Sequence, residues 1–285
     1  MDLGTIGVWT PAPGLLSAER ARGAVEEIEG LGFRTIWYPE SVGGKEALSQ
    51  GAMLLSWTER IVIAAGIANI AARDPMAMAN GARGLADAFP GRFLLGIGAS
   101  TDLSLPLRGH EYGRPLTRMR EYLDAMDEAA YLAPEPPEPG ERILAALGPK
   151  MLALAAKRAI GAHPGFVPVE HTVSAREALG SGPVLAVEQP VLLVSNRAEA
   201  REIAAEHMGY YLARRPYREN MLRLGFSEAD VEGAGSDSLF DAIRDRVRAH
   251  LEAGADHVCI EVVGSDRTDP QLEALRTLAP ALLEL

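Results

Sequence analysis

The sequence predicts an α/β fold, a (β/α)8 TIM-like barrel made by a single domain that spans residues 1–285. About eight short apolar runs alternate with longer amphipathic stretches, which is the pattern of βα units around a parallel sheet. Eight strands favour a closed barrel over an open sheet, and such barrels commonly run to about 250 residues as one domain. The expected strands cover residues 4–9, 33–38, 61–67, 92–98, 142–147, 159–163, 184–194 and 257–263.

Residues that start helices lie between these runs. Ser17 is a candidate N-cap, and Asp74 followed by a proline marks a second helix start. The proline-rich acidic segment 133–141 indicates an exposed connection, because proline is not tolerated in a helix interior. Residues 196–253 hold several helical segments and no clear strand, so we expect a helical insertion before the last strand.

Composition limits which binding partners and which kinds of site the protein is expected to have. A net charge of -11 without a concentrated basic face argues against a nucleic-acid partner. No apolar run reaches the ~20 residues of a membrane span, and the N-terminus lacks a signal-peptide pattern, so a soluble, cytoplasmic protein is expected. Cys259 is the one cysteine, which excludes an internal disulfide, and the histidines show no metal-ligand spacing, so no metal site is expected.

Two glycine-containing turns follow expected strands at the barrel end where active sites are built. Gly98, Ala99 and Ser100 follow the fourth strand, where bare backbone N–H groups and a hydroxyl can approach an anion. Gly148 and Pro149 open a helix after the fifth strand, and a helix N-terminus suits a phosphate. Either turn alone can be a plain turn, but the two together suggest a phosphorylated cofactor.

Three polar residues at strand ends are candidates for contact with a ligand. Asn69 interrupts an apolar run, either as a chance strand end or because its amide faces a ligand. Glu40 follows an aromatic pair, where a carboxylate can serve as general acid or base, with a salt bridge as the competing interpretation. His163 precedes a proline at the sixth strand end and is either a ligand contact or a structural histidine.

These segments together resemble the luciferase-like monooxygenase superfamily and, within it, the oxidoreductases that use the deazaflavin coenzyme F420. The resemblance covers nearly the whole chain in eight ordered blocks. The blocks are TIGVWT, GLGFRTIWYPES, RIVIAAGIANIAARDP, FPGRFLLGIGAS, RPLTRMREYLDAMD, ALGPKMLALAA, GAHPGFVPVEHT and HLEAGADHVCIEVV. It implies a TIM-like barrel with a late helical insertion that binds the coenzyme at its C-terminal mouth.

The resemblance also implies roles for individual residues. The third strand is expected to end in a bulge with a cis peptide bond between Gly66 and Ile67, which backs the cofactor ring. Asn69 is expected to hydrogen-bond near that ring. The turn at Gly98, Ala99 and Ser100 and the turn at Gly148 and Pro149 correspond to contacts with the side chain or phosphate of the coenzyme. The ring's other edge is expected to lie against Ala162 and His163, and Glu40 stands where many members carry histidine.

Two departures from the family pattern stand out. Thr101 follows the Gly98 turn where relatives often have a histidine, and residues 239–248 run into the last helix without the usual tryptophan-glycine turn. We expect an oxidoreductase that moves a hydride between F420 and a small organic substrate, with Glu40 or His163 handling a proton, and we expect a homodimer. The alternatives are an FMN-dependent two-component monooxygenase of the same superfamily and a degenerate barrel that binds a ligand without catalysis.

Overall fold

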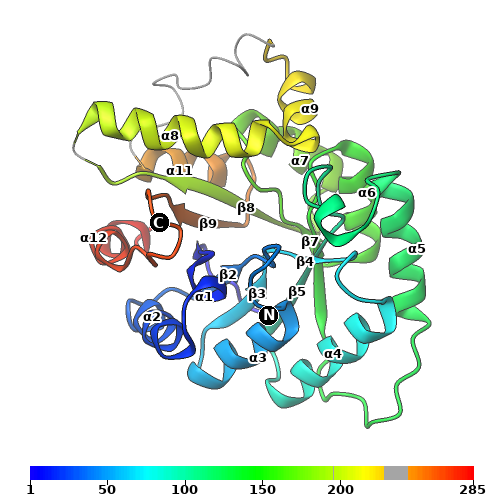
Figure 1. Ribbon diagram of the computed structural model, residues 1–285. Helices are drawn as coiled ribbons and strands as arrows, with labels where there is room; N and C mark the ends of the chain where they lie inside the picture. The colour runs from blue at the N-terminus through cyan, green and yellow to red at the C-terminus, as the bar shows by residue number, and fades with distance from the viewer. Residues whose placement is uncertain (195, 228–242) are drawn as a thin grey trace.

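The computed structural model describes residues 1–194, 196–227 and 243–285, which form a closed parallel barrel surrounded by helices (Figure 1). Its strands are β1 (Ile6–Trp9), β2 (Thr35–Tyr38), β3 (Val62–Ala65), β4 (Ala68–Asn69), β5 (Phe93–Gly98), β6 (Glu141–Leu144), β7 (Gly161–Ala162), β8 (Val184–Val191) and β9 (His257–Val262). They follow the order β3-β2-β1-β9-β8-β7-β6-β5-β4, and an additional pairing of β3 with β5 closes the ring. The predicted barrel is confirmed.

The third predicted strand consists of two pieces, β3 and β4, on either side of a cis peptide bond between Gly66 and Ile67. Both pieces pair with β5, through Ile63 with Phe93 and through Ala68 with Ile97. Because β3 and β4 together form one interrupted strand, the nine segments of the sheet make the eight barrel strands that the sequence predicts. The expected cis bond is confirmed at the expected position.

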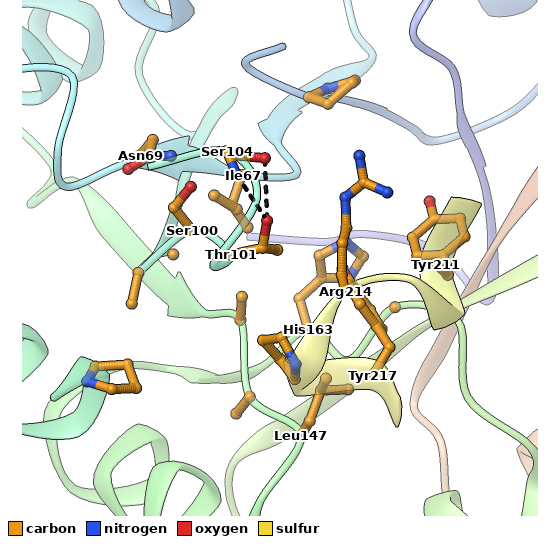
Figure 2. A pocket seen from close by; sticks show the side chains of 18 of the residues that line it. Ile67, Asn69, Ser100, Thr101, Ser104, Leu147, His163, Tyr211, Arg214 and Tyr217 are labelled. Atoms are coloured by element: carbon orange, nitrogen blue, oxygen red, sulfur yellow. Dashed lines mark hydrogen bonds between the residues drawn. The ribbon is translucent and has the colours of Figure 1, made fainter. Parts of the chain in front are cut away.

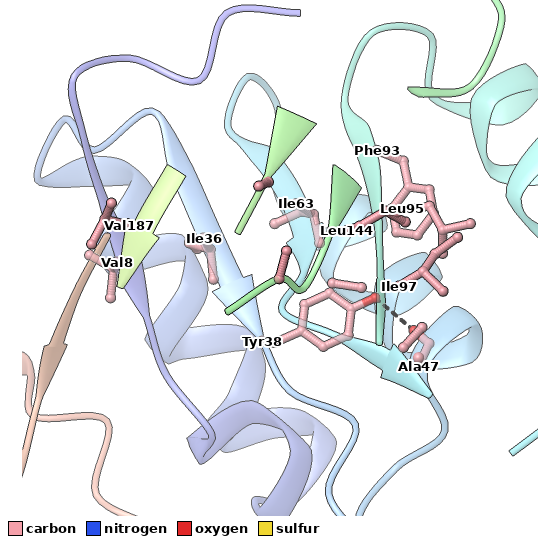
Figure 3. Close-up of a cluster of buried hydrophobic side chains, with 14 of the residues drawn as sticks. Val8, Ile36, Tyr38, Ala47, Ile63, Phe93, Leu95, Ile97, Leu144 and Val187 are labelled. Atoms are coloured by element: carbon pink, nitrogen blue, oxygen red, sulfur yellow. Dashed lines mark hydrogen bonds between the residues drawn. The ribbon is translucent and has the colours of Figure 1, made fainter. Parts of the chain in front are cut away.

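Alternation along the strands divides their side chains between the barrel interior and the helix layer. Val8, Ile36 and Ile63 are in register on β1, β2 and β3 and belong to a large cluster that includes helix residues such as Leu54 (Figure 3). Trp9, Trp37 and Ala64, which follow them in each strand, point the other way. They belong to a separate cluster inside the barrel, made of Leu3, Trp9, Trp37, Val62, Ala64, Leu94, Ile143, Ala186 and Cys259.

The helices begin at the residues that the sequence marks. Ser17 caps α2 by accepting a hydrogen bond from the Arg20 backbone, and Asp74 caps α4 with Pro75 as its first residue. The helices are α1 (Ala12–Leu15), α2 (Ala18–Gly30), α3 (Ala47–Trp57), α4 (Pro75–Ala88), the 3-10 helix η1 (Pro106–Arg108), α5 (Pro115–Asp127), α6 (Pro149–Arg158), α7 (Val169–Leu179), α8 (Arg197–Leu212), α9 (Arg215–Arg223), α11 (Ile243–Glu252) and α12 (Leu272–Leu282).

The predicted helical insertion lies between β8 and β9 and contains α8, α9 and α11. In Figure 1, α8 crosses one end of the barrel above β8, and α9 continues from it. Of the segment in which the sequence departs from the family pattern, 239–242 lies outside the described residues and 243–248 belongs to α11. No helix in the described ranges combines the length and the apolar character that crossing a membrane would take.

Gly96, in the middle of β5, has no space for a side chain. A Cβ there would lie 1.9 Å from the carbonyl oxygen of Ala65, which is backbone and cannot move aside cheaply. Gly96→Ala is expected to lower the free energy of unfolding by about 1–3 kcal/mol, the usual cost of overpacking. Gly84→Ala is the matched control, because Gly84 is an exposed α4 residue whose Cβ would meet no atom within 4 Å.

The control is expected to gain up to about 1 kcal/mol, since glycine is unfavourable in a helix interior. Urea unfolding of both variants measures the two effects. A Gly96→Ala protein as stable as Gly84→Ala would contradict the packing described for β5.

Candidate active site

A cavity of about 910 Å³ opens at the C-terminal ends of the barrel strands, and its volume suits a small-molecule site. Residues that follow each of the eight barrel strands line it, so that segments far apart in the sequence meet there. Figure 2 shows Asn69, Ser100 and Thr101 on one side of this cavity and the side chains of α8 and α9 on the other. The lining includes these predicted site residues: Glu40, Gly66, Ile67, Asn69, Gly98, Ala99, Ser100, Gly148, Pro149 and His163.

Ala162 differs from the other predicted site residues. It is fully buried within β7, and the residues that line the cavity do not include it. In β7 it pairs with Leu144 of β6 and with Leu185 of β8. Its neighbour His163 is the residue of this stretch that reaches the cavity.

The side chain of Ile67 forms an apolar part of the cavity next to the cis peptide bond. A Cβ on Gly98 would lie 2.4 Å from the Ile67 Cδ1 atom, so the bare glycine leaves the space that the isoleucine fills. On the other side of the bond, the Trp9 indole donates a hydrogen bond to the Gly66 carbonyl oxygen at 3.2 Å. The bulge therefore presents a packed apolar surface that a flat ring can lie against.

Asn69 lines the cavity directly beyond this bulge and is buried. Its Oδ1 accepts a hydrogen bond from the Ala71 backbone at 2.9 Å, and its own backbone N–H donates to the Glu40 carboxylate at 2.8 Å. These bonds fix the carbonyl side of the amide against its own chain. Its Nδ2 group makes no hydrogen bond to a described residue, so it is the end of the side chain that can meet a ligand.

The Glu40 carboxylate is held by three groups of the protein. Arg73 forms an ion pair with it, the Asn69 backbone donates to it, and the Ala47 backbone donates at 3.4 Å. Its side chain is 3% exposed, and that of Arg73 is 9% exposed. Arg73 also contacts Glu46 at 2.7 Å. These contacts favour the salt-bridge interpretation of Glu40 and give the residue a second task, which is to anchor the bulge through Asn69.

His163 lies buried at the base of the cavity, stacked on Trp37 with ring centroids 4.2 Å apart. Its Nδ1 is 2.9 Å from the Ala186 carbonyl oxygen, so this nitrogen carries the proton and donates. Burial lowers the pKa of His163 to about 4, which leaves the ring neutral at pH 7. In this tautomer the Nε2 atom can accept a proton or a hydrogen bond but has none to give.

Hydroxyl groups line the cavity after β5. Ser100 has a left-handed backbone with φ 69°, unusual for a residue with a side chain. Thr101 takes the position where a histidine was expected from the family pattern, and its hydroxyl donates to Ser104 Oγ at 3.0 Å. All three side chains line the cavity.

The N-terminus of α6 lies at another part of the cavity rim. Gly148 is its N-cap and Pro149 its first residue. Lys150 and Arg223 also line the cavity here, and the Arg223 guanidinium would lie within 3.6–3.9 Å of a Cβ on Gly148. Two cations at a helix N-terminus suit an anionic ligand group.

Aromatic and basic residues of the insertion complete the cavity, and the sequence reasoning missed them. Tyr210, Tyr211 and Arg214 come from α8 and the turn after it, and Tyr217 comes from α9. The Tyr211 ring stacks on Phe166 with centroids 4.5 Å apart. The signal was the dense YYLARRPY segment, but nothing in one sequence says that the insertion folds over the barrel mouth (Figure 1).

Two buried carboxyl groups were also missed. Glu188 of β8 lines the cavity, and Glu261 lies beside it on the neighbouring strand β9. They are 4% and 6% exposed. Burial raises the pKa of Glu188 well above its ordinary value and that of Glu261 to about 7. The signal was a charged residue inside each of two otherwise apolar strands.

Solved structures with the same fold include three enzymes of two kinds. An F420-dependent secondary alcohol dehydrogenase in complex with an F420-acetone adduct matches with a TM-score of 0.77 and 15% identity, covering 99% of both chains. The coenzyme F420-dependent tetrahydromethanopterin reductase of Methanopyrus kandleri matches with a TM-score of 0.69 and 14% identity, covering 100% of this chain and 99% of the other. The FMN-bound oxygenating constituent of a Pseudomonas putida 3,6-diketocamphane monooxygenase matches with a TM-score of 0.65 and 18% identity, covering 100% of this chain and 99% of the other.

Sequence comparison gives the family. A Mycobacterium tuberculosis protein, provisionally named a coenzyme F420-dependent oxidoreductase, is 32% identical over 126 residues, which are 44% of this chain. The match spans 35% of that relative's length. The profile of the luciferase-like monooxygenase family matches residues 1–265, and the barrel, the bulge and the cavity agree with it. The chain belongs to the luciferase-like monooxygenase family.

Proposed function

We propose that this protein is an oxidoreductase that binds coenzyme F420 and transfers a hydride between it and a small organic substrate. The observation that carries the proposal is the cavity at the barrel mouth, which combines an apolar bulge with polar and cationic groups. The names of the Mycobacterium tuberculosis relative and of two proteins with the same fold support it. When bound, the deazaflavin supplies or accepts the hydride.

The residues present fit such a cofactor. The ring is proposed to lie on the Ile67 bulge with the Asn69 amide at its edge. The phosphate-bearing tail is proposed to run toward the hydroxyls of Ser100 and Thr101 or toward the N-terminus of α6 at Gly148. These are the parts of the cavity that offer, respectively, a flat apolar surface and donors for an anion.

The insertion is proposed to cover the substrate. Tyr211 is a buried and Tyr217 a half-buried aromatic side chain on the side of the cavity away from Asn69 (Figure 2). Aromatic rings there exclude water from the space between the cofactor surface and α8, which favours hydride transfer over side reactions. Substrate therefore enters between the bulge and the insertion in this proposal.

An FMN-dependent monooxygenase is the second candidate, favoured by the FMN-bound Pseudomonas putida structure with the same fold. Equilibrium titration of the purified apoprotein with F420 and with FMN, followed by fluorescence, separates the two. We expect F420 to bind at least tenfold more tightly than FMN. Tighter binding of FMN would replace the proposal with the monooxygenase, and binding of neither would favour a degenerate barrel.

Asn69→Ala is expected to weaken F420 binding by about 1–2 kcal/mol, the scale of one lost hydrogen bond to a ligand. The same titration measures it as a roughly 5- to 30-fold rise in Kd. Asn80→Ala is the matched control, because Asn80 is an α4 residue whose amide donates to the Ala130 carbonyl and does not line the cavity. Equal affinities of the two variants would remove Asn69 from the cofactor site.

A further inference from the structure

The buried carboxyl pair Glu188 and Glu261 has a place in the fold that suits proton transfer. The residues stand on adjacent strands, where Glu188 is in register with Cys259 and Glu261 with Pro190. Both carboxyl groups are buried in the same part of the fold, where two negative charges side by side are unfavourable, so at least one of them carries a proton at neutral pH. A protonated carboxyl group at the base of an enzyme cavity is a potential acid.

Titratable and charged side chains from several elements surround Glu188. The Tyr211 hydroxyl donates to Glu188 Oε1 at 3.4 Å, and the His207 Nε2 atom lies 3.5 Å from Glu261 Oε2. Burial and the neighbouring Arg267 lower the pKa of His207 to about 4, so this imidazole is neutral and supplies no countercharge at pH 7. The titratable and charged groups that face Glu188 are Glu261 and Cys259 from β9, Arg267 from the loop after β9, Tyr211 from α8 and Tyr217 from α9.

Burial raises the pKa of both carboxyl groups of the pair. The nearby Glu261 raises the pKa of Glu188 further, because two neighbouring buried carboxylates resist ionising together. The pair therefore keeps a proton in the folded protein at neutral pH.

Glu188 is also the member of the pair that reaches the cavity. A Cβ on Gly165 would lie 2.3 Å from Glu188 Oε2, so the bare glycine keeps this oxygen uncovered. The two acid-base candidates found from sequence cannot donate in its place. Glu40 is bound in an ion pair with Arg73, and the His163 proton is committed to the Ala186 carbonyl oxygen.

We propose that Glu188 is the acid that gives a proton to the oxygen of a carbonyl substrate, and that Glu261 and Tyr211 position it. The proposal rests on the proposed function, which supplies the hydride. The carbonyl carbon gains a C–H bond from the hydride and its electron pair, while the electron pair of the C=O π bond takes the proton from Glu188. The substrate is reduced to an alcohol, the deazaflavin is oxidised, and Glu188 becomes a carboxylate.

The structure provides for that carboxylate. The Tyr211 hydroxyl and the Arg267 guanidinium both favour the charged form of Glu188, and each acts against the effect of burial. A proton taken up from solvent restores the acid before the next turnover. In the opposite direction, the same carboxylate accepts the proton of an alcohol.

One arm of the test needs neither cofactor nor substrate. The unfolding equilibrium constants of the unaltered protein, Glu188→Gln and Glu206→Gln are measured in urea between pH 5 and pH 8. The folded protein keeps the Glu188 proton, whereas the unfolded chain loses it above about pH 4.5, so Glu188 adds a contribution that favours unfolding as the pH rises and that Glu188→Gln lacks. The Glu188→Gln constant is expected to fall about tenfold relative to the unaltered protein for each pH unit.

Glu206→Gln changes an exposed carboxylate of α8 and is expected to leave that ratio constant. Carboxylic-acid absorption in the infrared at pH 7 gives a second readout, expected to be weaker in Glu188→Gln than in the unaltered protein, because Glu261, with a pKa of about 7, holds part of a proton itself. A pH-independent ratio in Glu188→Gln, with an undiminished infrared band, would overturn the proposal.

The other arm measures F420 affinity and the oxidation of reduced F420 by a panel of aldehydes and ketones. Glu188→Gln is expected to bind F420 normally and to lower kcat by about 10²- to 10⁴-fold, the range for loss of a general acid. Tyr211→Phe is expected to move the pH profile of kcat upward, because the tyrosine hydroxyl lowers the pKa of Glu188. A merely structural role of Tyr211 would leave the profile in place.

The outcomes separate this inference from the proposed function. If F420 does not bind, the proposed function fails and the catalytic inference falls with it. If F420 binds but no aldehyde or ketone is reduced, or if Glu188→Gln reduces them at the unaltered rate, the inference alone is overturned.

Discussion

The free energy of unfolding is expected to fall by about 2–3 kcal/mol for each pH unit as the pH drops from about 6 to about 4.5. The cause is a set of buried histidines whose pKa is lowered to about 4, mainly by burial: His163, His207, His250 and His257. In the unfolded chain they take up protons near pH 6.5, but in the folded chain they stay neutral until about pH 4. Acid therefore favours the unfolded state over this interval.

His257 shows why the folded protein resists protonation. Its Nδ1–H donates to the Gly4 carbonyl oxygen at 2.7 Å, and its Nε2 accepts from the Trp37 indole at 3.0 Å. A second proton, on Nε2, would place this N–H and the indole N–H of Trp37 against each other inside the barrel, where water cannot accept a hydrogen bond from either. His250 is similarly enclosed, between Thr172 and Gln189 at 2.7 and 2.8 Å.

The carboxyl pair changes the free energy of unfolding with pH in the opposite direction. Glu188 and Glu261 have a raised pKa and hold protons in the folded protein that the unfolded chain releases above about 4.5. Near pH 5.5 the four histidines add about four protons to the unfolded side and the pair about two to the folded side. The difference of about two protons corresponds to about 2.7 kcal/mol per pH unit.

Urea unfolding at pH 7, 6 and 5 measures this dependence. His257→Gln keeps a donor and an acceptor for Gly4 and Trp37 but cannot titrate, so its dependence should be weaker by about one proton, or about 1.4 kcal/mol per pH unit. His110→Gln changes an exposed loop residue and is the control. A stability that stays constant from pH 7 to pH 5 would show that the buried histidines are not held neutral.

The barrel could be predicted from sequence because its determinants are local. Each strand is an apolar run of a few residues, and each helix start carries its own cap, as Ser17 and Asp74 do. Such signals survive in a single sequence since neighbouring residues produce them. The cis bond at Gly66 and Ile67 is different, because only the family pattern indicated it.

The candidate site could be predicted where residues directly follow strands, as Ala99 and His163 do. The barrel brings the strand ends together, so a residue's position along its strand is enough to place it at the cavity. The insertion could not be placed in this way. Tyr211 reaches the cavity because α8 folds back over the mouth, and Glu188 pairs with Glu261 because β8 and β9 are neighbours across an insertion of more than sixty residues. Both contacts depend on tertiary structure.

Glu40 is a further residue whose role could not be predicted without the tertiary structure. A carboxylate at a strand end is equally consistent with catalysis and with a salt bridge as long as its partner is unknown. The partner is Arg73, which stands immediately before the α4 N-cap at Asp74, and the Tyr122 hydroxyl holds the Arg73 backbone carbonyl at 3.0 Å. The pairing follows from where β4 and α4 meet, which the sequence does not state.

Arg73→Met is expected to lower the free energy of unfolding by about 3–5 kcal/mol, because it leaves the Glu40 carboxylate buried without its cation. Methionine retains the length and packing of the arginine stem, so the loss reports the charge. Arg22→Met is the matched control, since Arg22 forms an exposed i,i+4 pair with Glu26 at 2.7 Å and is expected to cost less than about 0.5 kcal/mol.

The double variant Arg73→Met/Glu40→Gln separates charge from packing. A neutral glutamine needs no cation and still offers an oxygen to the Asn69 backbone N–H, so it is expected to recover more than half of the loss. Urea unfolding of the unaltered protein, Arg73→Met, Glu40→Gln and the double variant gives the coupling between positions 40 and 73 directly. Should Arg73→Met cost no more than Arg22→Met, the ion pair would not be what holds Glu40, and the carboxylate would return as a candidate acid-base group beside the bulge.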